Sequence, residues 1–241
     1  MIKKYIKYFL EIFLGKDYFK NRRAQNQSKL LFKLGIDALN RYNSVSKKLN
    51  FHFIPMFGTL LGAYRENDFI AFDDDIDMGL DIRYLSNNLI YALRDEGFEI
   101  DRIYISSNRR GVQLPMKYQG LTCDIYFLYK DNDIYHTYLP LALKDYGWTY
   151  SRKINIFRYK DVVVPYVDDF VNVPFHGKQI EIPSNSEKIL ARIYGEDFMI
   201  PKKNAHADPL INEISIYDKF YNCYPVDFCI SNGVLDKLSL E

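Results

Sequence analysis

The chain contains 241 residues, of which 48% are hydrophobic and 26% are charged. This length suits a single domain with a sizeable core, and the hydrophobic content excludes wholesale disorder. The 32 Lys and Arg residues nearly balance the 31 Asp and Glu residues, which excludes a nucleic-acid partner held by overall positive charge. The three cysteines, Cys123, Cys223 and Cys229, form no CxxC pair, so they favour a reducing compartment such as the cytoplasm over a disulfide framework or a zinc ribbon.

The first predicted element is a basic amphipathic helix within residues 1–25. Lys3, Lys4 and Lys7 fall on one arc of this helix, and apolar side chains cover the opposite arc. Residues 1–23 hold seven basic and two acidic side chains, a balance of +5. Such a helix either makes peripheral contact with an anionic membrane, at the inner face for a cytoplasmic protein, or packs on the domain or on a partner subunit. No run of about 18 uncharged apolar residues occurs, so no segment is expected to span a bilayer.

The rest of the chain predicts an α/β fold, with a small mixed sheet and helices packed behind it. Residues 26–130 alternate helical and strand-like patterns, which indicates a core, and residues 131–241 show a mixed pattern, which indicates a C-terminal elaboration of the same folded unit. In chain order we expect a helix from Asn26 or Ser28 to Leu49, a strand over 51–57, a short helix over 60–65, a strand over 74–80, a helix from 85 to about 97, strands over 98–105, 112–118 and 121–129, and a helix over 186–194.

The most informative stretch is the acidic run from Asp73 to Asp77, in which four of five residues are carboxylates. Like charges this close repel one another, so a cation should offset them. In a strand, side chains alternate between the two faces, which puts Asp73, Asp75 and Asp77 on one face and points Ile76 into the core. Oxygen donors on one edge suit Mg²⁺ or Mn²⁺, which bind through one or two carboxylates plus substrate phosphates.

Two other interpretations of the acidic run are open at this point. A calcium loop of the EF-hand type needs Gly and Glu where this chain has Met78 and Tyr84, which disfavours that loop. A solvated acidic turn is the ordinary interpretation of a charge run. The sequence just before the run weakens the second interpretation, because it is suited to binding phosphate.

Gly58 and Thr59 follow a predicted buried strand and open a short helix. Free N–H groups at a helix start, next to a glycine that permits close approach, form a phosphate site. Arg65, one to two turns along the helix, can reach the same anion with two parallel hydrogen bonds. Lys117, inside a predicted strand, can also meet phosphate charge, although a lysine in such a place is commonly just solvated.

The chain resembles the LicD/fukutin-like phosphotransferase family of the nucleotidyltransferase superfamily through two segments, Gly58–Arg65 (GTLLGAYR) and Phe72–Asp77 (FDDDID). The usual sequence motif of the family is G-T-L-L-G-x-x-R followed by Pro-Trp-D-D-D-x-D. Here Ala71 and Phe72 replace Pro-Trp, which keeps an aromatic residue before the acids. A later stretch is similar to the family's closing region, so the resemblance covers roughly residues 30–201.

The resemblance implies a nucleotidyltransferase-like sheet and a third carboxylate on a neighbouring strand. Asp124 fits this position, and metal ligation also explains a charge in an otherwise apolar run. An exposed place on an edge strand is the alternative for Asp124. The residues expected to be catalytic and to bind the metal are Asp75, Asp77 and Asp124, and those expected to bind the donor are Gly58, Thr59, Arg65 and Lys117.

The resemblance also implies an activity. This is the metal-dependent transfer of a phospho-alcohol group, phosphocholine-like, from a CDP-linked donor to a hydroxyl of a cell-surface glycan or its lipid-linked precursor, with release of CMP. Residues 26–130 would then form the catalytic core, and residues 131–241 would shape the acceptor side. An ordinary nucleotidyltransferase would instead attach NMP to a small molecule or protein and release pyrophosphate. A non-catalytic metal- or glycan-binding module is a further alternative.

Overall fold

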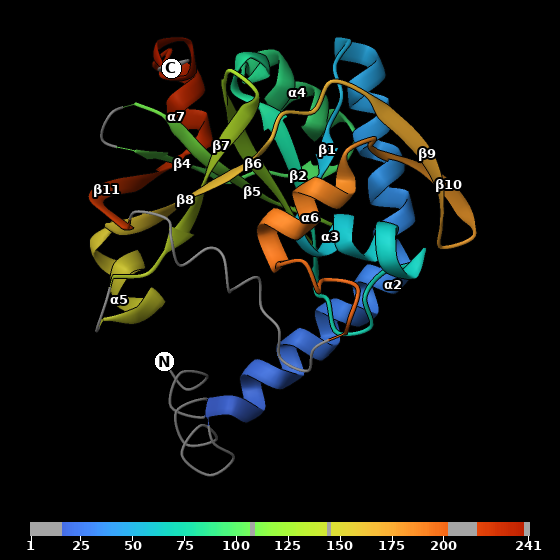
Figure 1. Cartoon of the computed structure of the whole chain (residues 1–241). Coiled ribbons are helices and arrows are strands. Elements are labelled where there is room, and N and C mark those ends of the chain that lie inside the picture. The colour runs from blue at the N-terminus through green and yellow to red at the C-terminus, as the bar shows by residue number, and fades with distance from the viewer. Residues whose placement is uncertain (1–15, 107–108, 144–145, 202–215, 239–241) are drawn as a thin grey trace.

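The computed structural model describes residues 16–106, 109–143, 146–201 and 216–238. It shows an α/β fold, as the sequence predicts (Figure 1). Most of the predicted first helix, residues 1–15, lies outside the described residues. The helices are α2 (Lys16–Leu49), α3 (Phe57–Leu61), α4 (Asn87–Asp95), α5 (Gly147–Ile154), α6 (Ser186–Tyr194) and α7 (Val226–Ser231), with a π-helical turn at Gly62–Glu66 and 3-10 turns at Ile82–Tyr84 and Leu235–Lys237.

Within the described residues, nine strands form one mixed sheet, and two further strands form a separate hairpin. The sheet is therefore larger than the small sheet predicted from the sequence. Its strands, in chain order, are β1 (Ile54–Pro55), β2 (Asp75–Asp81), β3 (Phe98–Glu99), β4 (Arg102–Ser106), β5 (Gly111–Tyr118), β6 (Leu121–Asp131), β7 (Ile134–Leu141), β8 (Phe157–Pro165) and β11 (Ile216–Pro225), and the hairpin consists of β9 (Phe170–Phe175) and β10 (Lys178–Pro183).

The pairing of the sheet has one parallel step, between β2 and β6, and the other pairings of the described strands are antiparallel. β6 also pairs with β5 and with β7. The pairings β5–β6–β7–β8–β11–β4–β5 therefore form a closed circuit, to which β2 is attached at β6 and β3 at β5. A parallel pair needs a long crossover connection, and residues 82–120 supply it with α4 and the strands β3 to β5.

α2 begins at Lys16, so the predicted helix start farther along the chain is wrong. No Gly or Pro lies between Lys16 and the predicted start, and nothing in the sequence therefore stops the helix earlier. Of the two residues expected to cap it, Asn26 and Ser28, Ser28 contacts another segment instead, and Gln27 between them does the same. Gln27 Nε2 donates to the backbone oxygen of Gly120 at 3.0 Å, and Ser28 Oγ donates to that of Ala71 at 3.1 Å. These contacts fix the helix to the β5–β6 turn and to the loop before the acidic run.

The strand predicted over residues 51–57 is mostly absent, because only Ile54–Pro55 pairs with β2. The chain then turns sharply into α3, and Phe57 has a φ of 45°, which is unusual for an aromatic residue. α6 confirms the helix predicted over residues 186–194.

Strands β7, β8 and β11 lie beyond residue 130, where the sequence indicated only a mixed pattern and one helix. Each of them has Lys, Asp or His at an inner position and a proline at or next to its last residue, and the charged or polar side chains interrupt the alternation that would have identified a strand. The sheet therefore continues across residue 130 without a break.

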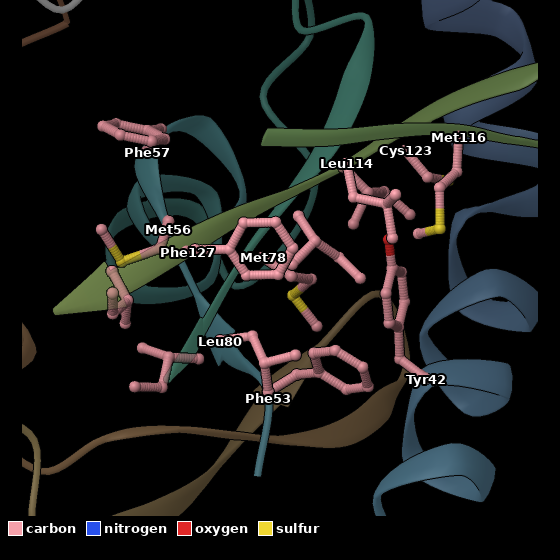
Figure 2. Close-up of a cluster of buried hydrophobic side chains, with 14 of the residues drawn as sticks. Tyr42, Phe53, Met56, Phe57, Met78, Leu80, Leu114, Met116, Cys123 and Phe127 are labelled. Carbon is pink, nitrogen blue, oxygen red and sulfur yellow. The ribbon is translucent and has the colours of Figure 1, made fainter. Parts of the chain in front are cut away.

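A large part of the apolar core lies between α2 and the β2–β6 part of the sheet (Figure 2). Tyr42 extends from α2 toward Leu114, Met116 and Cys123, and Phe53 lies beside Leu80. Full burial of a side chain of this size contributes about 1.5–3 kcal/mol relative to exposure. The inward-facing residues of β2 and β6, each no more than 4% exposed, are Ile76, Met78, Leu80, Cys123, Ile125 and Phe127.

No helix among the described residues is both long enough and apolar enough to cross a membrane. The three cysteines are all free, as the sequence predicts, with Cys123 and Cys229 buried.

Candidate active site

The parallel register of β2 and β6 brings the predicted carboxylates together. Asp77 lies opposite Asp124, and Asp75 lies opposite Thr122. Because side chains alternate along a strand, Asp75, Asp77 and Asp124 project from the face that is opposite Ile76 and the core. One carboxylate oxygen of each lies within 4.8 Å of the others. We refer to these three residues as the carboxylate cluster.

Because the carboxylate cluster is buried, it lowers the stability of the fold unless a counter-charge is present. Asp77 and Asp124 are 9% and 8% exposed. The Oδ1 atom of each has no hydrogen-bond partner among the described residues. A buried, unpaired carboxylate oxygen destabilises the fold unless a cation or a proton neutralises it. Carboxylate oxygens are also the ligands preferred by hard divalent cations, so the cluster fits such a metal.

The same burial favours the protonated forms of these acids. Burial raises the pKa of Asp124 to about 7, and a hydrogen bond from Gln113 opposes this increase. Burial and then the charges of neighbouring carboxylates raise the pKa of Asp75 to about 8. The pKa of Asp77 also rises well above its ordinary value, because of burial and the nearby charge of Asp75. A cation held by the cluster would act in the opposite direction and favour the charged forms.

Thr59 supports the cluster from α3. Its Oγ atom accepts a hydrogen bond from the backbone N–H of Asp77 at 3.0 Å, and its side chain is buried. The backbone oxygen of Asp77 in turn accepts from the N–H of Met56 at 3.0 Å. These two bonds fix the start of α3 against β2, so the side chain of Thr59, a residue predicted to bind the donor, is engaged in positioning Asp77.

Gly58 leaves space that the Asp73 side chain occupies. A Cβ atom at Gly58 would lie 2.3 Å from Asp73 Oδ2, which is far inside van der Waals contact. The Asp73 carboxylate accepts from the backbone N–H of Asp74 at 3.2 Å, and burial raises the pKa of Asp73 to about 6. The glycine therefore lets the acidic run approach α3 closely.

Arg65 links the turn after α3 to the segment after α6. Its Nη1 donates to the backbone oxygen of Phe198 at 3.0 Å, and its Nε donates to Glu66 Oε1 at 2.7 Å. Only 11% of the side chain is exposed. Much of the guanidinium predicted to bind an anion is thus engaged with the protein itself.

Lys117 is exposed on β5, and it forms no ion pair with another described residue. The register pairs Lys117 with Thr122 and Pro115 with Asp124, so Lys117 projects from the same face as the carboxylate cluster. The structure thus places the Lys117 side chain on the face of the sheet that carries the acids.

Two residues beside the cluster were not identified from the sequence. Gln113 on β5 forms a hydrogen bond with Asp124 and donates to Tyr126 Oη at 3.3 Å. The sequence offers one signal for Gln113, which is a polar residue inside the apolar stretch of β5. Tyr194 on α6 lies close to the cluster, since burial and then the charge of Asp77 raise the pKa of its phenol. No local pattern separates Tyr194 from an ordinary core residue of its helix.

A mixed α/β sheet that holds three carboxylates beside a short helix is the arrangement of a nucleotidyltransferase-type domain. Residues 50–185 match the model of one family, described as LicD/FKTN/FKRP, nucleotidyltransferase domain. The chain belongs to this family, and membership implies a transferase. The matched region contains β2, β6 and the whole carboxylate cluster, and it is shorter than the residues 30–201 that carry the resemblance in the sequence.

One curated relative is the Ribitol-5-phosphate transferase FKTN of Macaca fascicularis. It is 26% identical to this chain over 128 residues, which make up 52% of this chain and 26% of the relative. The chain therefore spans about a quarter of the length of that relative.

Proposed function

We propose that the protein transfers a phospho-alcohol group, of the phosphocholine type, from a CDP-linked donor to a hydroxyl of a cell-surface glycan or its lipid-linked precursor, and releases CMP. The observation that carries this proposal is the convergence of Asp75, Asp77 and Asp124 with two buried, unpaired oxygens. Family membership supports it, as does the name of the relative, a transferase of the phosphate ester of an alcohol.

In this proposal Asp75, Asp77 and Asp124 hold Mg²⁺ or Mn²⁺ together with the diphosphate of the donor. Both ions prefer carboxylate and phosphate oxygens, and both complete their coordination with water. When bound, the ion would neutralise negative charge that develops on the transferred phosphoryl group and on the leaving phosphate. The buried position of Asp77 and Asp124 keeps their oxygens oriented before the donor arrives.

The proposed reaction is a direct displacement at phosphorus. The acceptor hydroxyl oxygen forms a bond to the β-phosphorus of the donor. The bond from that phosphorus to the bridging oxygen breaks, and CMP leaves with the bridging oxygen and its electron pair. The proton of the acceptor hydroxyl passes to the nearest carboxylate of the cluster and then to solvent.

Four residues are proposed to serve the donor: Gly58, Thr59, Arg65 and Lys117. Lys117 makes the direct charge contact in this proposal, because its ammonium group is exposed on the face of the cluster. The other three shape the site. Gly58 makes room for Asp73, Thr59 holds Asp77, and Arg65 ties the turn after α3 to the segment after α6. Residues 131–241 are proposed to shape the acceptor side.

The test is a screen of CDP-linked alcohols with a glycan acceptor, in which mass spectrometry identifies the nucleotide product. Release of CMP with a phospho-alcohol on the acceptor supports the proposal. Release of pyrophosphate with NMP on the acceptor would establish the alternative, an ordinary nucleotidyltransferase. Metal binding without any turnover across the screen would indicate a binding module.

Calorimetry tests the proposed cooperation of metal and donor. The cluster supplies only part of a coordination shell, so Mg²⁺ alone should bind weakly, and the donor should bind much more tightly with Mg²⁺ or Mn²⁺ than in excess EDTA. Equal donor affinity in EDTA would contradict the proposal. Tight Ca²⁺ binding without nucleotide would contradict it as well.

We also propose that the protein works at the cytoplasmic face of the membrane through its basic first segment. Residues 1–23 carry a net charge of +5, and Arg22 and Arg23 near the start of α2 are exposed. Basic side chains at an anionic surface contribute about 1 kcal/mol each, less as salt screens them. The protein should therefore sediment with anionic liposomes at low salt and be released at high salt. Loss of solubility on deleting residues 1–23 would indicate packing instead.

A further inference from the structure

A cavity lies away from the carboxylate cluster, between the C-terminal end of α2 and the β9–β10 hairpin, which run side by side in Figure 1. Its volume is about 560 Å³, which is within the range of small-ligand sites. We call it the amide groove. Its lining residues are Asn43, Ser46, Lys47, Asn50, Phe51, His52, Tyr84, Asn172, Gln179, Ile180 and Glu181.

One wall of the amide groove comes from the end of α2 and the residue that follows it. Asn43, Ser46 and Lys47 stand at positions i, i+3 and i+4 of the helix, where they neighbour one another, and Asn50 follows the helix with a φ of 57°. All four are polar, and Asn43, Lys47 and Asn50 are exposed. The last turns of α2 and Asn50 thus present polar side chains to the groove.

The opposite wall is the hairpin. Asn172 of β9 pairs directly with Glu181 of β10, and Gln179 lies two residues before Glu181 on the same face. His52 joins the two walls: its ring stacks on Phe170 with centroids 4.7 Å apart, and its Nδ1 lies 3.4 Å from Glu181 Oε2. The hairpin is therefore held in place beside α2.

The floor of the groove is aromatic. The ring of Tyr84 packs on the ring of Phe51 with centroids 4.9 Å apart and an interplanar angle of 35°. Phe51 is buried, at 6% exposed, whereas Tyr84 is 38% exposed. Phe51 therefore supports the tyrosine from below, and part of the tyrosine ring stays open to a ligand.

The polar lining carries little net charge and many unused hydrogen-bond groups. Lys47 and Glu181 cancel one another in formal charge. Each amide supplies two N–H donors and one carbonyl acceptor. The four amide side chains, none of which hydrogen-bonds to another described residue, are Asn43, Asn50, Asn172 and Gln179.

We propose that the amide groove binds neutral sugar units of the acceptor glycan. A sugar offers many hydroxyls, each both donor and acceptor, and this matches amides better than it matches charged side chains. Its flat C–H face packs on an exposed aromatic ring such as that of Tyr84. A phosphate-rich or sulfated ligand does not fit, because Lys47 is opposed by Glu181.

A short segment of chain joins the groove to the residues beside the carboxylate cluster. Only six residue steps separate His52, at the groove, from Gly58, beside Asp73, and an extended chain covers at most about 20 Å over that length. A short oligosaccharide spans such a distance. The inference rests on the proposed transfer to a glycan, but binding in the groove can be measured without turnover.

The test is saturation-transfer NMR and calorimetry on the full chain without donor. The probes are neutral tetrasaccharides of glucose, galactose, N-acetylglucosamine and N-acetylgalactosamine, with dextran sulfate and polyphosphate as anionic comparators. At least one neutral tetrasaccharide should bind, and Tyr84→Ala and Asn172→Ala should each weaken it at least tenfold. Tyr91→Ala changes a tyrosine that is 48% exposed on α4 outside the groove, and should bind as the unchanged protein does.

Two results would overturn the proposal: binding of none of the neutral tetrasaccharides, or equal binding by the groove variants and the unchanged protein. Melting curves identify a variant that has lost its fold, and Tyr84→Phe then replaces Tyr84→Ala, with affinity retained if the ring makes the contact. If the donor screen finds no transfer while groove variants still lose sugar binding, the transfer proposal fails and the groove stands.

Discussion

The two faces of the β2–β6 pair have opposite chemistry, although they are built from alternate residues of the same two strands. One face carries Asp75, Asp77 and Asp124, whose oxygens are buried and in part unpaired. The other face carries Ile76 and Cys123, which are fully buried against α2. The apolar face stabilises the fold, and the acidic face destabilises it wherever its carboxylates are charged and no cation or proton neutralises them. Substitutions on the two faces should therefore separate stability from activity.

The largest effect is expected on the acidic face. Asp77→Asn should lower transfer by at least about 10²–10³-fold, because it removes a charge placed to hold the metal. Without metal, the free energy of unfolding should stay level or rise, since a repulsive buried charge is gone. Kinetics and denaturant titration check both parts, with Asp133→Asn in the exposed β6–β7 turn as a control. A large loss of stability would show that Asp77 is structural.

The matching change on the apolar face is Ile76→Ala. It removes a side chain that is 0% exposed, so it should lower the free energy of unfolding by about 2–5 kcal/mol. Activity per folded molecule should fall far less than in Asp77→Asn. Urea denaturation measures the loss, and Ile154→Ala, at a residue 37% exposed, should cost much less. Equal costs at the two positions would contradict the packing described for the β2 face.

The hydrogen bond from the Asp77 N–H to Thr59 Oγ ties strand β2 to helix α3. Thr59→Val keeps the shape of the side chain but leaves a buried N–H without an acceptor, at a cost of about 1–3 kcal/mol. Thr59→Ser keeps the hydroxyl and should retain most of the stability. Similar melting temperatures for the Val and Ser variants would mean that the bond contributes little.

The acidic face should also make stability depend on pH. In the metal-free protein the pKa values of Asp124 and Asp75 are raised from 3.8 to about 7 and about 8. The folded state then binds more protons than the unfolded state between pH about 4 and about 8, so stability should fall as pH rises through this window. Thermal melts across this range check it. Saturating Mg²⁺ should flatten the dependence, and an unchanged slope with Mg²⁺ would speak against metal binding at the cluster.

The smallest effect is expected inside the apolar face. The hydroxyl of Tyr42 is buried, points among apolar side chains that include Leu114 and Met116 (Figure 2), and has no partner among the described residues. Tyr42→Phe removes a desolvated group without opening a cavity, so the melting temperature should stay level or rise slightly. A clear drop would reveal a partner for the hydroxyl, such as a buried water.

The sequence predicts the fold well where apolar periodicity is local. The bounds of α6 match the prediction, and β2, β5 and β6 begin within one residue of it. Beyond residue 130, β11 depends on distant partners, since it pairs with β4 and β8, and Lys, Asp or His side chains interrupt the apolar alternation of β7, β8 and β11. The start of α2 was not predicted because Asn26 and Ser28 resemble capping residues, whereas Ser28 bonds to Ala71 and the helix begins at Lys16.

The candidate site also has features that the sequence predicts and features that only the structure reveals. The convergence of Asp75, Asp77 and Asp124 could be predicted, because the strand pattern puts the first two on one face, the family resemblance implies the third, and the register brings them together. The packing of Thr59 and Arg65 could not be predicted, since a hydroxyl or a guanidinium bonds equally well to phosphate or to the protein backbone. Only the three-dimensional structure distinguishes those partners.

The position of β11 determines when the sheet can finish folding during synthesis on the ribosome. β11 comes from residues 216–225, yet it lies between β8 and β4 and closes the circuit of strands. The residues of the carboxylate cluster are therefore translated long before the sheet that supports them can close. Until then β4 and β8 present unpaired edges, which are prone to aggregation. Shortening the chain ahead of β11 should leave an insoluble fragment rather than a smaller working enzyme.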